Sequence, residues 1–139
     1  MQGSIERALA LVGDRWSLLI LRDVFRGKRR FGDFCTDLGI ARNILADRLD
    51  RLVEAGILQR VPYQERPVRH EYRLTPKGRD LSPALIALLR WSDRWAAEDG
   101  ETQTLLVHDA CGQELEQLLR CPACDVEVTP THIRSRRSA

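Results

Sequence analysis

A mainly helical α+β fold with one small β-hairpin is what the sequence predicts, and three observations support this fold class. Apolar residues recur at helical spacing through most of the first 100 positions. Two of these helical segments are separated only by a short turn at Gly39-Ile40. Alternating residues interrupted by prolines then replace the helical pattern between residues 57 and 74. The 139 residues fit one domain with an appendage, so we expect a domain over 1–100 and an extension over 101–139.

The first two helices are predicted from their apolar residues. Ile5, Leu9 and Val12 follow i, i+4, i+7 spacing, which indicates a short amphipathic helix that Gly13 ends. Residues 16–25 are apolar on most sides, so they predict a buried helix.

Two further helices are predicted on either side of Gly39. The inner stripe of the first consists of Phe31, Phe34, Cys35 and Leu38. The inner stripe of the second consists of Leu45, Leu49 and Leu52, and Ala55-Gly56 ends it, with Ile57 covering the end. Two short helices joined by a tight turn are typical of a helix-turn-helix. Cys35 is interpreted as a small core residue because it lies on an inner stripe.

A β-hairpin is predicted next. Residues 57–61 indicate one strand, and Tyr72 and Leu74 alternate with charged residues in a second. Because Pro62 and Pro67 exclude a continuous central strand, we expect the loop YQERPVRH to protrude. Its tip would carry three basic residues, Arg66, Arg69 and His70. A helix-turn-helix followed by such a hairpin predicts a winged helix.

The last helix is expected to run from Thr75-Pro76 to about Gly100, with Pro83 kinking it or restarting it behind Ser82 as a second cap. It carries more apolar residues than a single contact needs, which suggests burial against a second copy of the chain. The alternative is that the hairpin and the first helix cover both of its faces within one chain.

Three tryptophans, Trp16, Trp91 and Trp95, are interpreted as residues of the core and of the dimer contact. A cavity between their helices is where we expect a small-molecule effector, if the protein has one.

Composition excludes several classes of protein. Hydrophobic residues make up 43% and charged residues 30%, which is typical of a folded domain. No apolar run approaches the ~20 residues of a membrane-spanning helix, and no export signal is recognisable. We therefore expect a cytoplasmic protein without a membrane partner, whose four cysteines are free thiols or metal ligands rather than disulfides. We detect no internal repeat.

Charge is unevenly distributed along the chain. Residues 22–79 contain 14 basic and 8 acidic residues, whereas residues 98–127 contain eight acidic residues and the single basic residue Arg120. A basic middle segment beside an acidic tail favours an anionic partner, and with a winged helix that partner is double-stranded DNA.

The second helix of the helix-turn-helix would read base edges. With its leucines turned inward, Asn43, Ala46 and Asp47 face outward, and Arg42 lies at its N-terminal edge. Arg42 could donate to O6 and N7 of guanine, Asn43 could pair with N6 and N7 of adenine, and Asp47 could accept from the amino group of cytosine. Each contact would favour the correct base over a wrong one by about 1–3 kcal/mol. For Arg48 a phosphate contact and a structural ion pair are both open.

Two further basic groups would bind the phosphate backbone. Lys28, Arg29 and Arg30 precede the first helix of the motif, which crosses the backbone. Arg66, Arg69 and His70 would bind from the hairpin, with Arg66 suited to a narrow minor groove.

The tail contains the motifs HDACG and CPACD. The two-residue spacing within His108/Cys111 and Cys121/Cys124 lets both members of each pair bind one ion, so the four residues predict one structural zinc ion in a small zinc ribbon. The tail has too few apolar residues for an independent core, so the metal would stabilise it. His132 is a competing ligand, and a Cys121–Cys124 redox dithiol or inert thiols are the alternatives.

The chain from Ile5 to Trp95 resembles the HxlR-type winged-helix transcriptional regulators of bacteria, which are related to the MarR group. The similarity is carried by Trp91 and three segments: ERALALVGDRWSLLILRDVFRGKRRFGDF, LGIARNILADRLDRLVEAGIL and VPYQERPVRHEYRLTPKGRDL. It implies a DNA-binding homodimer formed by the first and last helices, at the bacterial nucleoid. Some members sense oxidants through a cysteine before the first helix, but residues 3–5 contain none. Some also carry HxxCG and CxxCG tails, from which Asp125 departs.

We therefore expect a sequence-specific DNA-binding regulator, a repressor that binds a palindromic operator as a homodimer. The alternatives are a winged-helix protein-interaction module and a thiol- or metal-responsive sensor without direct DNA readout. A thiol enzyme built on CPAC is disfavoured because the βαβ context of thioredoxin-like dithiols is missing. The chain is therefore predicted not to be an enzyme.

Overall fold

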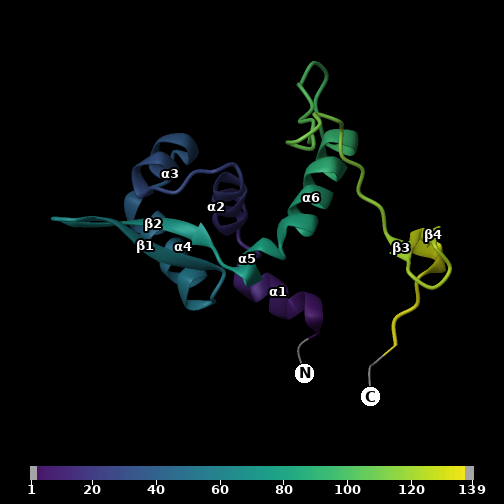
Figure 1. Ribbon diagram of the computed structural model, residues 1–139, viewed down its shortest axis with the longest axis horizontal. Helices are drawn as coiled ribbons and strands as arrows, with labels where there is room; N and C mark the ends of the chain where they lie inside the picture. The colour runs from purple at the N-terminus through teal and green to yellow at the C-terminus, as the bar shows by residue number, and fades with distance from the viewer. Residues whose placement is uncertain (1–2, 137–139) are drawn as a thin grey trace. The chain divides into compact units, whose positions relative to one another are not determined.

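A computed structural model describes residues 3–136 (Figure 1). Its contacts divide the chain into two units, one ending at Leu85 and the other beginning at Ile86. Within the described residues, no helix has both the length and the apolar character needed to cross a lipid bilayer.

Four helices form the body of the first unit: α1 (Ser4–Val12), α2 (Arg15–Phe25), α3 (Phe31–Leu38) and α4 (Arg42–Glu54). The predicted stripes of α2, α3 and α4 supply most of the core, in which Ile20, Phe34 and Leu49 have no exposed surface. Cys35 is half-buried and packs against this core, as predicted. The predicted helix α1 and its end at Gly13 are confirmed; within the chain only its Val12 reaches the core, and Ile5 and Leu9 are exposed.

Glycines in the left-handed conformation end both helices of the helix-turn-helix. Gly39 (φ 59°) ends α3, and its N–H donates to the Cys35 carbonyl. Gly56 (φ 72°) follows α4, and the next N–H, that of Ile57, returns to the carbonyl of Leu52 at 3.0 Å. This is the capping pattern that glycine permits after a helix. The predicted turn and helix stop are both confirmed.

The hairpin, which we call the wing, consists of β1 (Leu58–Glu65) and β2 (Val68–Leu74) in antiparallel pairing. Its strands are longer than predicted, because β1 continues through Pro62, which lies opposite His70 where the register shifts. A register shift tolerates a proline that a regular ladder would not. Of the three predicted tip residues, only Arg66 lies in the turn between the strands, and Arg69 belongs to β2.

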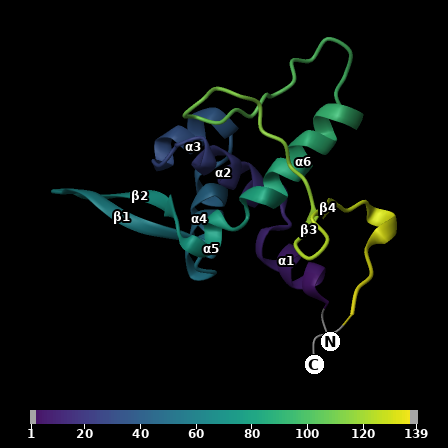
Figure 2. The same cartoon turned by 45° about the vertical axis from the view of Figure 1, so that its right-hand side comes forward.

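The wing is attached to α3 and extends away from the helices in both views (Figures 1 and 2). The Tyr72 N–H of β2 donates to the Arg29 carbonyl at 2.7 Å, just before α3. The Tyr72 ring meets the Phe34 ring edge-on, with centroids 6.5 Å apart. These contacts fix the position of the wing relative to the helix-turn-helix.

The predicted last helix is divided in two. α5 (Pro76–Arg79) is capped by the Thr75 hydroxyl, which accepts from the Gly78 N–H at 3.1 Å. The helix restarts as α6 (Ser82–Trp95), with Pro83 in its first turn, so the predicted restart is confirmed, although Ser82 is the first helical residue rather than the cap. The predicted end near Gly100 was wrong, because α6 ends at Trp95.

Both α1 and α6 carry exposed apolar residues. On α1, Ile5 is 73% and Leu9 60% exposed, and on α6 Trp91 is 61% exposed. No residue of α6 is buried. Trp16, in contrast, is half-buried and packs against the core of the first unit, as predicted.

In the second unit the chain beyond α6 forms small hairpins. The short strands β3 (Arg120–Cys121) and β4 (Val126–Glu127) pair antiparallel, and a single bridge joins Val107 to Glu114. A 3-10 turn, η1 (Pro130–His132), follows. None of the described residues after Gly78 is buried.

Candidate nucleic-acid interface

α4 presents a polar outer face. Its leucines at 45, 49 and 52 are fully buried, which turns Asn43 and Asp47 outward, where both are exposed. Arg42, the first residue of the helix, is also exposed, and Ala46 is half-buried. The structure therefore places the predicted base-reading residues on one outer face of one helix.

Two arginines of the predicted interface lie over aromatic rings. The Arg42 guanidinium is 4.9 Å from the centroid of Phe31, the first residue of α3. The Arg30 guanidinium is 4.4 Å from the centroid of Tyr63 on the wing. Such stacking restricts the side chain while leaving the N–H groups at its edge able to donate. The sequence analysis missed both rings as positioning residues, since neither is adjacent to its arginine in the chain.

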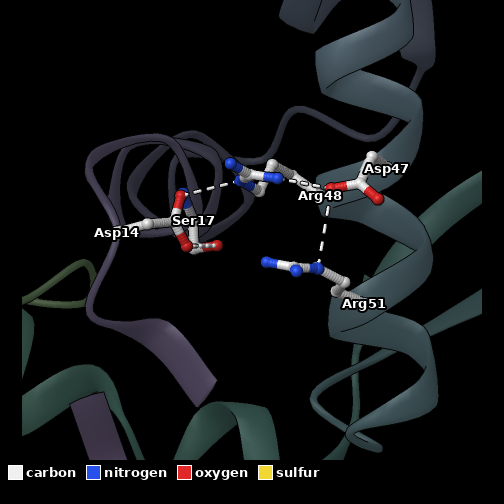
Figure 3. Close-up of polar contacts among 5 residues, drawn as sticks. All are labelled: Asp14, Ser17, Asp47, Arg48 and Arg51. Carbon is white, nitrogen blue, oxygen red and sulfur yellow. Dashed lines mark hydrogen bonds and ion pairs between the residues drawn. The ribbon is translucent and has the colours of Figure 1, made fainter. Parts of the chain in front are cut away.

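Arg48 is held by carboxylates (Figure 3). Its Nε donates to Asp14 Oδ1 at 3.0 Å, and its Nη1 pairs with Asp47. Asp47 also lies 3.6 Å from Arg51 Nε, one helical turn along α4. Of the two interpretations left open for Arg48, the structure shows the ion pair. Asp14 is a partner that sequence reasoning missed, because it lies 34 residues away.

Asp14 also caps α2, and its pKa is lowered. Its carboxylate accepts from the Ser17 N–H at 3.0 Å and from the Ser17 hydroxyl. Partial burial alone would raise the pKa of Asp14, but the Ser17 and Arg48 hydrogen bonds stabilise the charged form and bring the pKa below its usual range. One carboxylate thus joins the start of α2 to the middle of α4.

Lys28 is also paired within the protein. Its ammonium lies 3.4 Å from Asp23 and contacts Asp37. The hydrogen bond to Asp37 raises the pKa of Lys28, with a further contribution from Asp23. Asp23 is fully buried in α2 and also pairs with Arg22 at 2.8 Å. A buried carboxylate needs such partners, so Lys28 has a structural role that sequence reasoning missed.

The remaining basic residues of the predicted interface are exposed. Arg29 lies before α3, Arg66 in the wing turn, and Arg69 and His70 on β2. None of these four forms an ion pair with another described residue. On the other strand, Arg60 pairs with Asp50 of α4. Positive charge available to an anion therefore lies mainly on the wing and at the start of α3.

An apolar pocket lies against α1. It is lined by residues of α1, α5 and the adjoining segments: Ala8, Leu11, Val12, Ile57, Lys77 and Leu81. None of these is one of the tryptophans between which the sequence analysis expected an effector cavity.

The predicted metal ligands form two separate pairs. His108 Nδ1 lies 3.2 Å from Cys111 Sγ. In the other pair, hydrogen bonds to the Cys121 sulfur from Cys124 and from the Ala123 N–H lower the pKa of Cys121. Within residues 3–136 the structure holds no group of three or more His, Cys, Asp or Glu side chains placed to share one ion. His132 contacts Thr129 rather than any of these four.

Comparison with known proteins gives one consistent result. The profile of the HxlR-like helix-turn-helix family matches residues 11–100. An HTH-type transcriptional regulator of Mycobacterium tuberculosis is 46% identical over 130 residues, which are 94% of this chain and 82% of the relative. The HTH-type transcriptional regulator YodB of Bacillus subtilis is 33% identical over 99 residues, or 70% of this chain and 88% of YodB.

Solved structures are similar as well. The crystal structure of PA1607, a candidate transcription factor, superposes with a TM-score of 0.88 at 38% identity, covering 99% of this chain and 96% of that one. The reduced form of the redox regulator HypR gives a TM-score of 0.62 at 29% identity, covering 66% of this chain and 92% of that one.

Proposed function

The chain belongs to the HxlR family of helix-turn-helix transcriptional regulators, a family of regulators rather than enzymes, and we propose that it is a homodimeric repressor that binds a palindromic operator. Family membership implies DNA binding. The proposal adds the dimer, the symmetry of the DNA site and the direction of regulation.

The outer face of α4 supports sequence-specific binding. Arg42 and Asn43 lie at the N-terminal end of the helix, the part that meets base edges in a helix-turn-helix complex. Stacking on Phe31 restricts Arg42 before DNA arrives, which lowers the entropy lost on binding. Arg48 instead positions α4 through its ion pair with Asp14.

The wing and the segment before α3 support phosphate binding. Arg29, Arg66, Arg69 and His70 are exposed and distributed over both segments. Each residue that neutralises one phosphate adds about 0.9 to the negative slope of log K against log salt concentration. Lys28 contributes less than its neighbours because two carboxylates already pair with it.

The exposed apolar residues of α1 and α6 support the homodimer. Large apolar side chains such as Ile5, Leu9 and Trp91 are costly to leave in water, and a second copy of the chain would cover them. A twofold dimer would present two α4 helices about one duplex turn apart, and hence select a palindromic site. A dimer on such a site excludes other proteins from the same DNA, which is the physical basis of repression.

The single observation that carries the proposal is the outward polar face of α4 beside an exposed basic wing. The test is fluorescence anisotropy with labelled duplexes selected from a random pool on immobilised protein, together with sedimentation to determine the oligomeric state. We expect enrichment of a palindrome, one dimer per duplex, and weaker binding at higher salt.

Two variants and a control make the test specific. Asn43→Ala should weaken binding to the selected site far more than to random DNA. Arg66→Ala should weaken both alike and reduce the salt slope by about one unit. Arg134→Ala, an exposed residue beyond η1 and outside both the predicted DNA interface and the helices proposed for the dimer, should change neither. Failure to bind any duplex at low salt would favour the protein-interaction module. A monomer bound to an asymmetric site would contradict the dimer.

A further inference from the structure

The tail contains a tandem repeat that the sequence analysis did not detect. Residues 105–115 read LLVHDACGQEL and residues 118–128 read LLRCPACDVEV, so five of eleven positions are identical when the segments are aligned 13 residues apart. The identical residues are two leucines, an alanine, a cysteine and a glutamate. The repeat is easily overlooked because His108 in the first copy is aligned with a different residue, Cys121, in the second.

The backbones of the two copies make the same hydrogen bonds. The Leu115 N–H donates to the Leu106 carbonyl at 2.8 Å, and 13 residues later the Val128 N–H donates to the Leu119 carbonyl at 2.7 Å. The bridge between Val107 and Glu114 likewise corresponds to the pairing of Arg120 with Glu127. Each copy is therefore a small β-hairpin, and the two are structural repeats.

The turns that connect the two strands of each hairpin also have the same backbone hydrogen bond and conformation. The Gly112 N–H donates to the His108 carbonyl at 2.7 Å, and the Asp125 N–H donates to the Cys121 carbonyl at 2.9 Å. Gly112 (φ 71°) and Asp125 (φ 56°) are both left-handed. Among the described residues other than glycine, Asp125 alone has positive φ, a conformation that is strained for most residues but tolerated by aspartate. The second turn thus retains the shape of the first without its glycine.

Each turn places two soft donors on one side of a hairpin end. His108 Nδ1 and Cys111 Sγ are 3.2 Å apart. Two ligands of a tetrahedral zinc ion with Zn–N and Zn–S bonds of usual length are about 3.5 Å apart, so this pair is already close to chelating geometry. In the other turn, Cys121 and Cys124 have the same two-residue spacing at the end of the matching hairpin.

No apolar core accounts for the fold of these hairpins. Leu105, Leu118, Leu119 and Val126 are each at least half exposed, and none of the described residues after Gly78 is buried. Two-stranded hairpins of this size are marginal in water without a further cross-link. Something other than burial within the chain must therefore stabilise them.

We propose that the two hairpins are the halves of one zinc site, in which His108 and Cys111 from the first and Cys121 and Cys124 from the second bind a single Zn²⁺ ion. The ion takes a ring nitrogen and three thiolates, so three thiol protons leave for solvent as it binds. Binding draws the two turns onto one ion and closes the tail into a ribbon. A disulfide between Cys121 and Cys124 would leave the matching first turn without a role.

The test uses the full chain purified without added metal. Elemental analysis should find one zinc per chain. After removal of zinc by a chelator under reducing conditions, Co²⁺ should restore the absorption of a tetrahedral cobalt–thiolate site. Amide hydrogen exchange in residues 105–128 should slow at least tenfold when Zn²⁺ is returned, because an open hairpin exchanges freely.

Variants from both hairpins decide whether they act together. His108→Ala and Cys124→Ser should each abolish the tetrahedral cobalt spectrum, whereas Cys35→Ser, in α3, and His132→Ala should retain it. Circular dichroism should show unchanged helix content in the three tail variants, because every core residue precedes Gln59, and in Cys35→Ser, because serine is close in size to the half-buried cysteine that it replaces. Zinc retained in His108→Ala would overturn the shared site, as would a metal-free protein with a Cys121–Cys124 disulfide or four titratable thiols.

Discussion

Two glycines in helices should respond oppositely to the same substitution. Gly78 in α5 and Gly32 in α3 both have helical rather than left-handed backbones. A Cβ at Gly78 would lie 2.2 Å from the Ile57 carbonyl oxygen and 3.0 Å from a methyl of Leu74. A Cβ at Gly32 would meet no atom within 4 Å. We expect Gly78→Ala to destabilise the protein and Gly32→Ala to stabilise it.

The size of each stability change depends on two opposing effects, the higher helix propensity of alanine and the steric cost of its Cβ. Alanine favours a helix over glycine by up to about 1 kcal/mol, and this gain applies in full only to Gly32, where space is open. At Gly78 the contact with Ile57 is backbone, so α5 must move away by most of an ångström, which costs about 1–3 kcal/mol or more. For a unit of this size, each kcal/mol shifts Tm by about 4–8 °C. Gly78→Ala should therefore lower Tm by roughly 5–15 °C, and Gly32→Ala should raise it by a few degrees.

The assay is thermal and urea unfolding followed by circular dichroism, at one fixed protein concentration because the proposed dimer would contribute to apparent stability. The m-value should stay constant while the midpoint moves in opposite directions for the two variants. If Gly78→Ala were as stable as the wild type, the close approach of α5 to Ile57 would not restrict the fold, and our reasoning on this contact would be wrong.

Three further predictions concern the core, the α2–α4 contact and the DNA interface. Leu49→Ala should lower the free energy of unfolding by about 2–5 kcal/mol, measured by urea unfolding, because this side chain is fully buried. Asp14→Asn keeps a capping group but loses the charge paired with Arg48. Since the pKa of Asp14 is lowered by folding, its contribution is present at neutral pH and disappears as the pH falls below about 4, so urea midpoints of variant and wild type should converge in acid. Arg42→Ala should weaken binding to the selected operator and reduce preference at one base pair by about 1–3 kcal/mol, measured by competition with single-base variants; equal weakening on every sequence would place Arg42 on phosphate.

The helical framework could be predicted from the sequence because it depends on local periodicity. The leucines at 45, 49 and 52 identify the buried face of α4, and Gly39 and Gly56 identify where helices end. The wing was predicted as a hairpin but with strands that were too short, because tolerance of Pro62 depends on a register shift that only the pairing reveals.

Contacts between residues distant in the chain could not be predicted. Nothing near Asp14 in the sequence indicates that it meets Arg48, and nothing near Asp23 indicates that it is buried beside Lys28. For Ile5 and Leu9, periodicity identifies an apolar face but does not show what covers it. The polar outer face of α4 could be predicted, whereas the residues that hold it in position could not.

The contact between Asp14 and Arg48 has a mechanical consequence. Asp14 lies in the two-residue connection between α1 and α2, so the carboxylate that caps one helix also anchors the helix that would enter the groove. A movement of the α1–α2 connection would therefore act on α4 through this ion pair, in addition to the direct packing of α1 on α4.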